Sequence, residues 1–201
     1  MVFRKKYFIF QGKTNSARYN IRMNSDLVFR RGTDKDISTF LSFFKTTIPA
    51  LFPQYSPTSI AFTIEADYNP QWLTERLQKG GKKLFLAFMN EEVIGYLLIT
   101  KSIAGVSFAD WLGVDKKNQK KGVASQLLSL WKQEALEEGA HALQLWTSEN
   151  NVEFYKKRGF SCGGIFPKAW HGEDCYLIYE ILREPDEKNF LKDYLQKVKK
   201  G

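Results

Sequence analysis

The stretch between residues 106 and 139 constrains the fold more than any other part of the chain. Residues 106–114 predict a strand, and a lysine-rich turn over residues 119–125 leads into a long helix. The apolar residues of this helix recur at steps of three and four: Val123, Ala124, Leu127, Leu128, Trp131, Ala135 and Leu136. Gly139 ends the helix. A strand followed by an amphipathic helix predicts a sheet with this helix packed on one face.

The turn at residues 119–125 has the properties of an anion-binding site. The first N–H groups of a helix have no partner within the helix and lie at the positive end of its dipole. Gly122 and the small Ala124 allow an anion to approach the backbone, and lysines surround the turn: Lys116, Lys117, Lys120 and Lys121. The turn is neither a Walker loop nor a three-glycine dinucleotide loop. It predicts a site for a ligand with more than one phosphate, and the alternative is a solvated loop that caps a helix.

Apolar periodicity predicts the other elements, and the whole pattern is of the α/β class. Strands are expected at residues 27–31, 84–89, 93–100, 142–146, 160–166 and 175–182. Helices are expected at residues 33–44, 70–79, 148–155 and 186–200. Three prolines, Pro49, Pro53 and Pro57, predict an irregular, aromatic-rich connection over residues 47–69. The order of elements predicts a mixed, mostly antiparallel central sheet flanked by helices, not an alternating doubly wound one.

The charge of the chain lies at its ends. The net charge is +8 over 201 residues, but residues 1–22 carry six basic groups and no acidic one, and residues 23–182 carry 18 of each sign. We therefore expect a basic N-terminal extension at 1–22, disordered or a mispredicted start, a domain at 23–183 and an amphipathic tail at 184–201. A neutral domain argues against the readout of nucleic acid through the fold.

The chain is expected to be cytoplasmic. No apolar run approaches the roughly 20 residues of a membrane span, and the apolar run at residues 8–10 is too short for a secretory signal. Two cysteines, Cys162 and Cys175, could meet across a hairpin, but two thiols do not make a disulfide framework. With no Cys or His cluster at ligand spacing, no metal site is expected.

Two motifs together resemble the GCN5-related N-acetyltransferase (GNAT) superfamily. The first is Gln119-x-x-Gly122-x-Ala124 after a strand that ends at Val114, and the second is the segment 154–160, Phe-Tyr-Lys-Lys-Arg-Gly-Phe. The resemblance covers roughly residues 26–182, including the order of elements. It implies the acyl-CoA N-acyltransferase fold, with acetyl-CoA as co-substrate and direct attack by an amine in a ternary complex.

The resemblance also implies which residues contact the coenzyme. The turn would hold the coenzyme A pyrophosphate, and the preceding strand would present backbone groups to the acetyl and pantetheine units. The implied residues are Leu112, Gly113, Val114, Gln119, Lys120, Lys121, Gly122, Val123, Ala124, Ser125, Asn150 and Asn151. The helix before Tyr155 departs from the family pattern, with Ser148 and Asn151 where an asparagine and an alanine are usual. Either Asn150 or Asn151 is therefore the candidate for the pantetheine contact.

Acetyl transfer to an amine needs a neutral amine, a polarised carbonyl and a proton for the departing thiolate. The resemblance implies Tyr155 as the proton donor, with a packed aromatic as the alternative. Free alkylamines are mostly protonated at neutral pH, so we predict that Asp110 accepts the amine proton through water. A structural or solvent-facing carboxylate is the alternative for Asp110. Trp170 and His171 are predicted to border the acceptor site, whereas His141 is expected to be structural.

The leading prediction is an N-acetyltransferase, monomeric or homodimeric, that acts on the primary amine of a small molecule or of a peptide. The rival is a non-catalytic acyl-CoA-binding module, or a protein whose basic ends tether it to nucleic acid or an acidic partner. Intact Tyr155 and the intact turn favour the enzyme. The aromatic connection over residues 47–69 could wall a pocket for a small amine or belong to the core, and it contains no acidic cluster that would call for a polycation.

Overall fold

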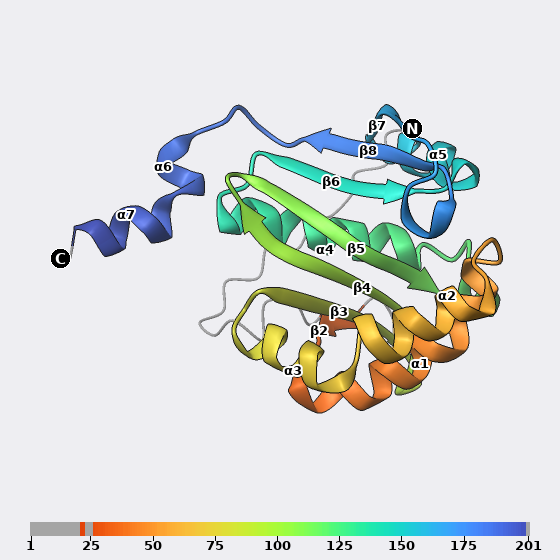
Figure 1. Ribbon diagram of the computed structural model, residues 1–201. Helices are drawn as coiled ribbons and strands as arrows, with labels where there is room; N and C mark the ends of the chain where they lie inside the picture. The colour runs from red at the N-terminus through yellow and green to blue at the C-terminus, as the bar shows by residue number, and fades with distance from the viewer. Residues whose placement is uncertain (1–20, 23–25, 200–201) are drawn as a thin grey trace, which may run out of the picture.

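One eight-stranded sheet forms the centre of the computed structural model, which describes residues 21–22 and 26–199. The strand order is β1-β2-β3-β4-β5-β6-β8-β7 (Figure 1). The strands are β1 (Ile21–Arg22), β2 (Leu27–Arg31), β3 (Lys82–Met89), β4 (Glu92–Ile103), β5 (Val106–Val114), β6 (Ala142–Thr147), β7 (Ser161–Phe166) and β8 (Cys175–Ile181). Among these described strands, only β5 and β6 pair in parallel. The predicted mixed, mostly antiparallel sheet is confirmed.

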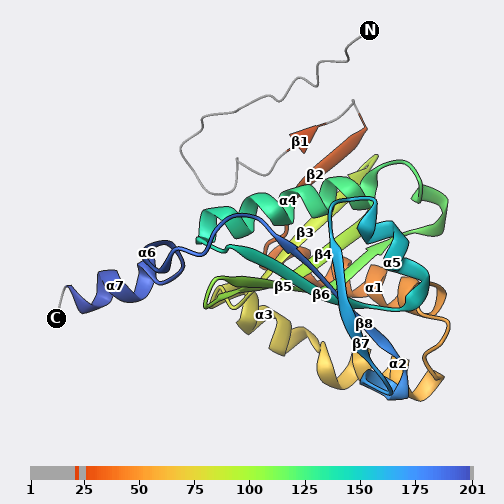
Figure 2. The same ribbon diagram turned by 90° about the horizontal axis from the view of Figure 1, so that it is seen from above.

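Helices cover both faces of the sheet (Figures 1 and 2). One face carries α1 (Ile37–Leu51), α2 (Pro57–Phe62) and α3 (Pro70–Gln78), and the other carries α4 (Val123–Glu138) and α5 (Glu149–Lys156). Short helical turns precede, connect or follow these helices: η2 (Asp34–Asp36), the π-helical η3 (Thr63–Asp67), η4 (Lys116–Asn118) and η5 (Trp170–Gly172). Near the C-terminus, α6 (Glu187–Phe190) and α7 (Lys192–Val198) extend away from the sheet.

The central strands bury side chains on both faces because alternate residues of a strand point to opposite sides. Phe85 and Ala87 of β3 pack in the core beneath α4. Their neighbours Leu84 and Leu86 pack in the second core, with α1 and α3. This double burial explains why β3 and β4 have nearly continuous apolar sequences.

The aromatic connection differs from the expectation. Pro49 lies in the last turn of α1, which continues to Leu51, so the first proline does not end the helix. Pro49 is exposed, so a local distortion of this last turn would displace no neighbouring helix or strand. The helix therefore tolerates the proline. Ser56 caps α2 by accepting a hydrogen bond from the Ser59 N–H at 3.1 Å. Residues 57–67 are therefore helical, where an irregular segment was expected.

The start of the sheet and the form of the tail differ from the expectation. Ile21 and Arg22 pair with Phe29 and Val28 of β2, so the sheet begins within the segment expected to be an extension. Residues 1–20 of that segment lie outside the described residues. The tail forms two short helices instead of one, and Lys101 fixes α7 through an ion pair with Asp193 at 3.0 Å.

The two cysteines do not face each other. In the hairpin of β7 and β8, Cys162 pairs in register with Ile178, and Cys175 with Phe166. Both are free thiols. The possible disulfide across the hairpin is therefore wrong for this register. Among the helices of residues 21–22 and 26–199, none is long and apolar enough to span a bilayer.

A charged capping box at η2, the turn that precedes α1, gives a first prediction. The carboxylate of Asp36 accepts hydrogen bonds from the Thr33 N–H at 2.8 Å and from Arg30 at 2.6 and 2.8 Å. The Arg30 guanidinium, against the opposing effect of partial burial, lowers the pKa of Asp36 to about 2. The folded protein therefore holds this group charged at pH values where the unfolded chain protonates it.

We expect Asp36→Asn to lower the free energy of unfolding at pH 7 by about 1–2 kcal/mol, a value already reduced for solvent screening. Because the folded pKa is lowered, this stabilisation is present above the unfolded pKa of 3.8 and is lost as the pH falls toward about 2. Urea unfolding of both proteins across this pH range measures it. A difference that stays constant down to the lowest pH would contradict the assignment.

Candidate functional site

The site lies where the two parallel strands separate. β5 and β6 pair only from Val106 with Ala142 to Ala109 with Leu145. Beyond these pairs β5 continues to Val114 beside β4 alone, and β6 continues to Thr147 beside β8. Among the described strands, none pairs with the β6 side of residues 110–114, so this edge keeps backbone N–H and C=O groups for a ligand. Two cavities open along it, and Leu112 lines both.

The first cavity, here called the turn cavity, has a volume of about 550 Å³ and runs along the start of α4. Gly122 is the N-cap of α4 with φ +85°, a conformation that favours glycine. The first helical bond links the Gln126 N–H to the Gly122 carbonyl, so the N–H groups of residues 123–125 precede the hydrogen-bonded part of the helix. A Cβ atom at Gly122 would have no protein atom within 4 Å, because the residue faces open space.

The turn is held in place by its own side chains. The Gln119 amide donates to the Val114 carbonyl at 3.1 Å, which ties the turn to the end of β5. The Lys121 ammonium donates to the Asn118 side chain at 3.0 Å. Of the predicted coenzyme contacts, only Lys121 does not line the turn cavity; those that do are Leu112, Gly113, Val114, Gln119, Lys120, Gly122, Val123, Ala124, Ser125, Asn150 and Asn151. Lys116 lines it as well.

Arg158 is a cation that sequence reasoning did not place in the site. Its Nε donates to the Ser125 hydroxyl at 2.9 Å, and another nitrogen donates to the Phe154 carbonyl at 2.6 Å. The guanidinium lies 3.6 Å from the centre of the Phe154 ring. These contacts position a permanent positive charge beside the start of α4 and in the wall of the turn cavity. Only the fold brings residue 158 to residue 125.

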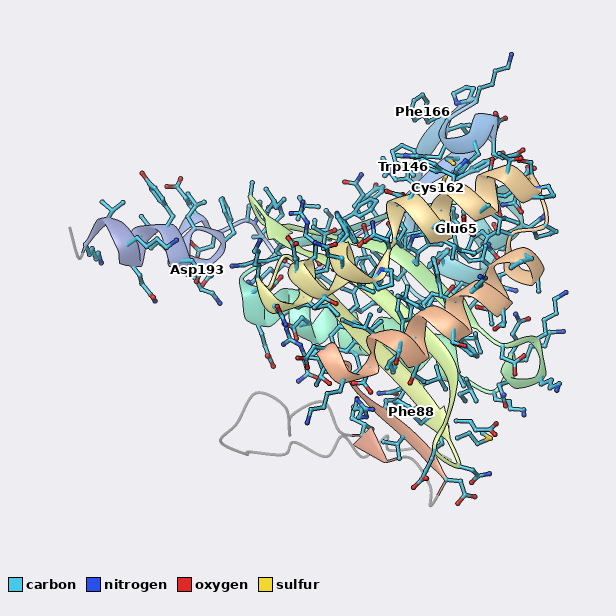
Figure 3. All side chains as sticks on the ribbon, turned by 60° about the horizontal axis from the view of Figure 1, so that its bottom comes forward. Glu65, Phe88, Trp146, Cys162, Phe166 and Asp193 are labelled. Atoms are coloured by element: carbon cyan, nitrogen blue, oxygen red, sulfur yellow. The ribbon has the colours of Figure 1, made fainter. Side chains whose placement is uncertain are left out.

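The second cavity, here called the aromatic cavity, has a volume of about 280 Å³. Trp170 and His171 both line it, as expected of residues that border an acceptor. The His171 ring lies 4.7 Å from the Tyr55 ring, so the β8 hairpin and the α1–α2 connection meet there. Trp146 of β6 forms another wall and packs against Phe166 of the hairpin at 6.1 Å (Figure 3).

Tyr155 stands where the two cavities adjoin. Six residues line both cavities: Phe52, Gln54, Leu112, Ser148, Asn151 and Tyr155. Tyr155 is only 7% exposed and packs against Phe154 and Phe160. Burial raises the pKa of the Tyr155 hydroxyl, and the nearby Arg158 opposes this only in part. The phenol is therefore protonated at neutral pH and able to donate a proton at the junction.

Asp110 lines the aromatic cavity from a bulge in β5. The register passes from Ala109 with Ile99 to Trp111 with Leu98, which leaves Asp110 without a partner on β4. Its carboxylate accepts from the Lys82 ammonium at 2.6 Å and from the Thr100 hydroxyl at 3.2 Å. Burial raises the pKa of Asp110, and the pair with Lys82 opposes this shift. Asp110 thus forms an ion pair and also lines the aromatic cavity.

The described part of the chain contains no group of three or more His, Cys, Asp or Glu side chains placed to hold a metal ion. His141 lies outside both cavities, and its ring packs against Phe190 at 5.7 Å.

The parallel strands β5 and β6 thus separate beside a glycine turn at the start of α4, and the buried Tyr155 lies between the two cavities. The family profile of the acetyltransferase (GNAT) domain matches residues 51–164. The chain therefore belongs to the GNAT acetyltransferase family. A search of curated proteins finds no match in sequence.

Solved structures share the fold at low identity. PaiA N-acetyltransferase from Thermoplasma acidophilum, in complex with coenzyme A, is 18% identical with a TM-score of 0.66, over 77% of this chain and 98% of that one. YncA from Salmonella typhimurium, solved with acetyl-CoA, is 18% identical with a TM-score of 0.65, over 81% and 97%. A GNAT-family acetyltransferase from Streptococcus pneumoniae is 20% identical with a TM-score of 0.62, over 79% and 100%.

Proposed function

We propose that this protein is an acetyl-CoA-dependent N-acetyltransferase that acetylates a primary amine. The observation that carries the proposal is the position of Tyr155 and Leu112 in the walls of both cavities. A donor in the turn cavity and an acceptor in the aromatic cavity would meet at these two residues.

The two cysteines of the protein, Cys162 and Cys175, are free thiols, which suits a reducing compartment. We therefore propose that the reaction takes place in the cytoplasm.

Coenzyme binding follows from the chemistry of the turn cavity. The free N–H groups of residues 123–125 bind the pyrophosphate at the positive end of α4. Lys116, Lys120 and Arg158 supply the cations that a ligand with several phosphates needs. The unpaired edge of residues 110–114 offers hydrogen bonds to the amide groups of pantetheine, which extends toward Tyr155.

The reaction is a single displacement at the thioester. The amine must first lose its extra proton, which passes through water to Asp110, whose raised pKa makes it a stronger base. The amine nitrogen then attacks the acetyl carbon, and a backbone N–H near Leu112 stabilises the oxyanion. As the carbon–sulfur bond breaks, Tyr155 donates its proton to the thiolate. The products are the acetamide and free coenzyme A.

Titration calorimetry with acetyl-CoA, followed by thiol release with a panel of amines, tests this function. Binding together with acceptor-dependent thiol release supports it, and a mass increase of one acetyl group on the acceptor nitrogen identifies the product. Failure to bind acetyl-CoA would contradict the proposal.

We expect Arg158→Gln to weaken the binding of coenzyme A about tenfold, because a charge-assisted contact to phosphate is lost. The loss should become smaller at high ionic strength, since salt screens this attraction. Calorimetry measures both effects. Lys157→Gln is the matched control, because this neighbouring cation is exposed and does not line the turn cavity. Equal losses in the two variants would argue for a general effect of net charge instead.

A further inference from the structure

The walls of the aromatic cavity combine rings and carboxylates. The rings are Phe52, Tyr55, Tyr68, Phe108, Trp111, Trp146, Tyr155, Trp170 and the imidazole of His171, and the carboxylates are Asp67, Asp110, Glu173 and Asp174. Among the described residues that line it, none is a lysine or an arginine. Aromatic faces and carboxylates both attract cations, so the two kinds of wall favour the same class of ligand.

The carboxylates differ in how their charge is balanced. At the inner end, Asp110 is neutralised by Lys82, with Nζ and Oδ1 2.6 Å apart. Glu173 is half-buried, and in the described part of the chain it forms no ion pair. Among the described residues, the Asp174 carboxylate accepts a hydrogen bond from the Lys168 N–H at 2.9 Å and forms no ion pair. Asp67 on η3 likewise forms no ion pair within the described part of the chain. Unbalanced negative charge therefore lies at the hairpin end of the cavity, where two such carboxylates are adjacent, and at Asp67.

The pKa values of two tyrosines in the walls, Tyr55 and Tyr68, reflect the carboxylates near them. Burial raises the pKa of Tyr55 to about 12, and the nearby Cys175 and Glu173 add to the shift. Burial also raises the pKa of Tyr68, to which Asp110 is the main charged contributor. Tyr55 thus lies near Glu173, whereas Tyr68 lies near both Asp110 and Asp67. The cavity therefore has one carboxylate that is neutralised by a lysine, Asp110, and carboxylates without an ion pair at Asp67 and at the hairpin.

The size of the cavity limits the ligand. A volume of about 280 Å³ lies at the lower limit of small-molecule sites. It fits a narrow aliphatic chain better than a broad ring system. A chain that reaches the Tyr155 junction with one end extends toward Glu173 with the other.

We propose that the acceptor is a linear aliphatic diamine or polyamine, with one amine at Tyr155 and a second, charged amine near Glu173 and Asp174. This inference rests on the proposed N-acetyltransferase function and adds the substrate class. After transfer, the reacted end is a neutral acetamide and the distant ammonium remains charged. The second cation serves in binding and takes no part in the chemistry.

The test compares three matched acceptor series with the full-length protein: α,ω-diamines, n-alkylamines and ω-amino acids of the same chain lengths. We expect the best diamine to exceed its alkylamine in kcat/KM by about tenfold or more, mainly through KM, because one added cation meets carboxylates and rings. The amino acid should be poorer than the alkylamine, because it places a carboxylate at the negative end.

Charge removal at the hairpin end separates recognition from chemistry. The double variant Glu173→Gln, Asp174→Asn should reduce the preference for the diamine over the alkylamine toward one, mainly by raising the KM for the diamine. Glu65→Gln is the matched control, since Glu65 is an exposed carboxylate on η3 outside the cavity (Figure 3). Thermal unfolding and acetyl-CoA binding of each variant show that fold and donor site are intact.

The failures of the two proposals differ. Equal use of diamine and alkylamine, or a peptide N-terminus as the best acceptor, overturns the diamine assignment and leaves the N-acetyltransferase intact. Binding of acetyl-CoA without turnover of any amine overturns the proposed N-acetyltransferase and, with it, the acceptor assignment. Absence of acetyl-CoA binding overturns the proposed function itself.

Discussion

Replacing Gly122 with valine should raise the dissociation constant for acetyl-CoA at least about 100-fold, equivalent to a loss of almost 3 kcal/mol. Two effects add. Valine at φ +85° is strained, which shifts the turn away from its present conformation. Its side chain also enters the open space in front of the first N–H groups of α4, where the ligand phosphate must approach. Calorimetry with acetyl-CoA measures the loss.

Gly80→Val is the matched control for this experiment. Gly80 has φ +69°, its Cβ would likewise meet no atom within 4 Å, and it lines neither cavity. Both variants should lose similar stability from the strained backbone, whereas only Gly122→Val should lose the coenzyme. Normal binding by Gly122→Val would show that the anion does not contact this turn.

Elements with a local sequence pattern could be predicted, whereas elements that depend on distant contacts could not. The strand at residues 106–114 and the helix from Val123 were predictable because each follows a local period and a glycine ends the helix. The helical turns at residues 57–67 were not predictable, because prolines mark a break without showing that helix resumes after it. The pairing of Ile21 with Phe29 depends on the sheet edge, which no local pattern records.

The same distinction applies to the site. The turn cavity could be predicted because residues 112–125 are contiguous, and their chemistry is visible in one segment. For the aromatic cavity, the sequence indicated Asp110, Trp170, His171 and an aromatic wall, but not the set of carboxylates, because these come from η3, β5 and the β7–β8 loop. Residues 47–69 contain no acidic cluster, so this segment alone did not indicate a cation site. Glu173 lies far away in the sequence, and only the fold brings it near Tyr55. The contacts of Asp110 with Lys82 and of Arg158 with Ser125 likewise link distant segments.

Replacing Tyr155 with phenylalanine should lower kcat about 100-fold with little change in acetyl-CoA binding, because only the proton donor is removed. The phenylalanine ring keeps the packing against Phe154 and Phe160. Burial raises the pKa of Tyr155 above its ordinary value of 10, so the wild-type enzyme keeps its donor protonated throughout the neutral and mildly alkaline range. Any fall in wild-type rate below pH 10 must then come from another group.

The pH profile of thiol release therefore separates the donor from the base. A group that accepts the amine proton must be deprotonated, so Asp110 would limit the rate at low pH, above its usual carboxyl range because burial raises its pKa. Tyr155→Phe should keep this acidic limb and lower the whole curve. Tyr179→Phe, which removes a hydroxyl outside both cavities, should leave the curve unchanged. Full turnover by Tyr155→Phe would mean that water protonates the thiolate and that the buried tyrosine serves only to separate the two cavities.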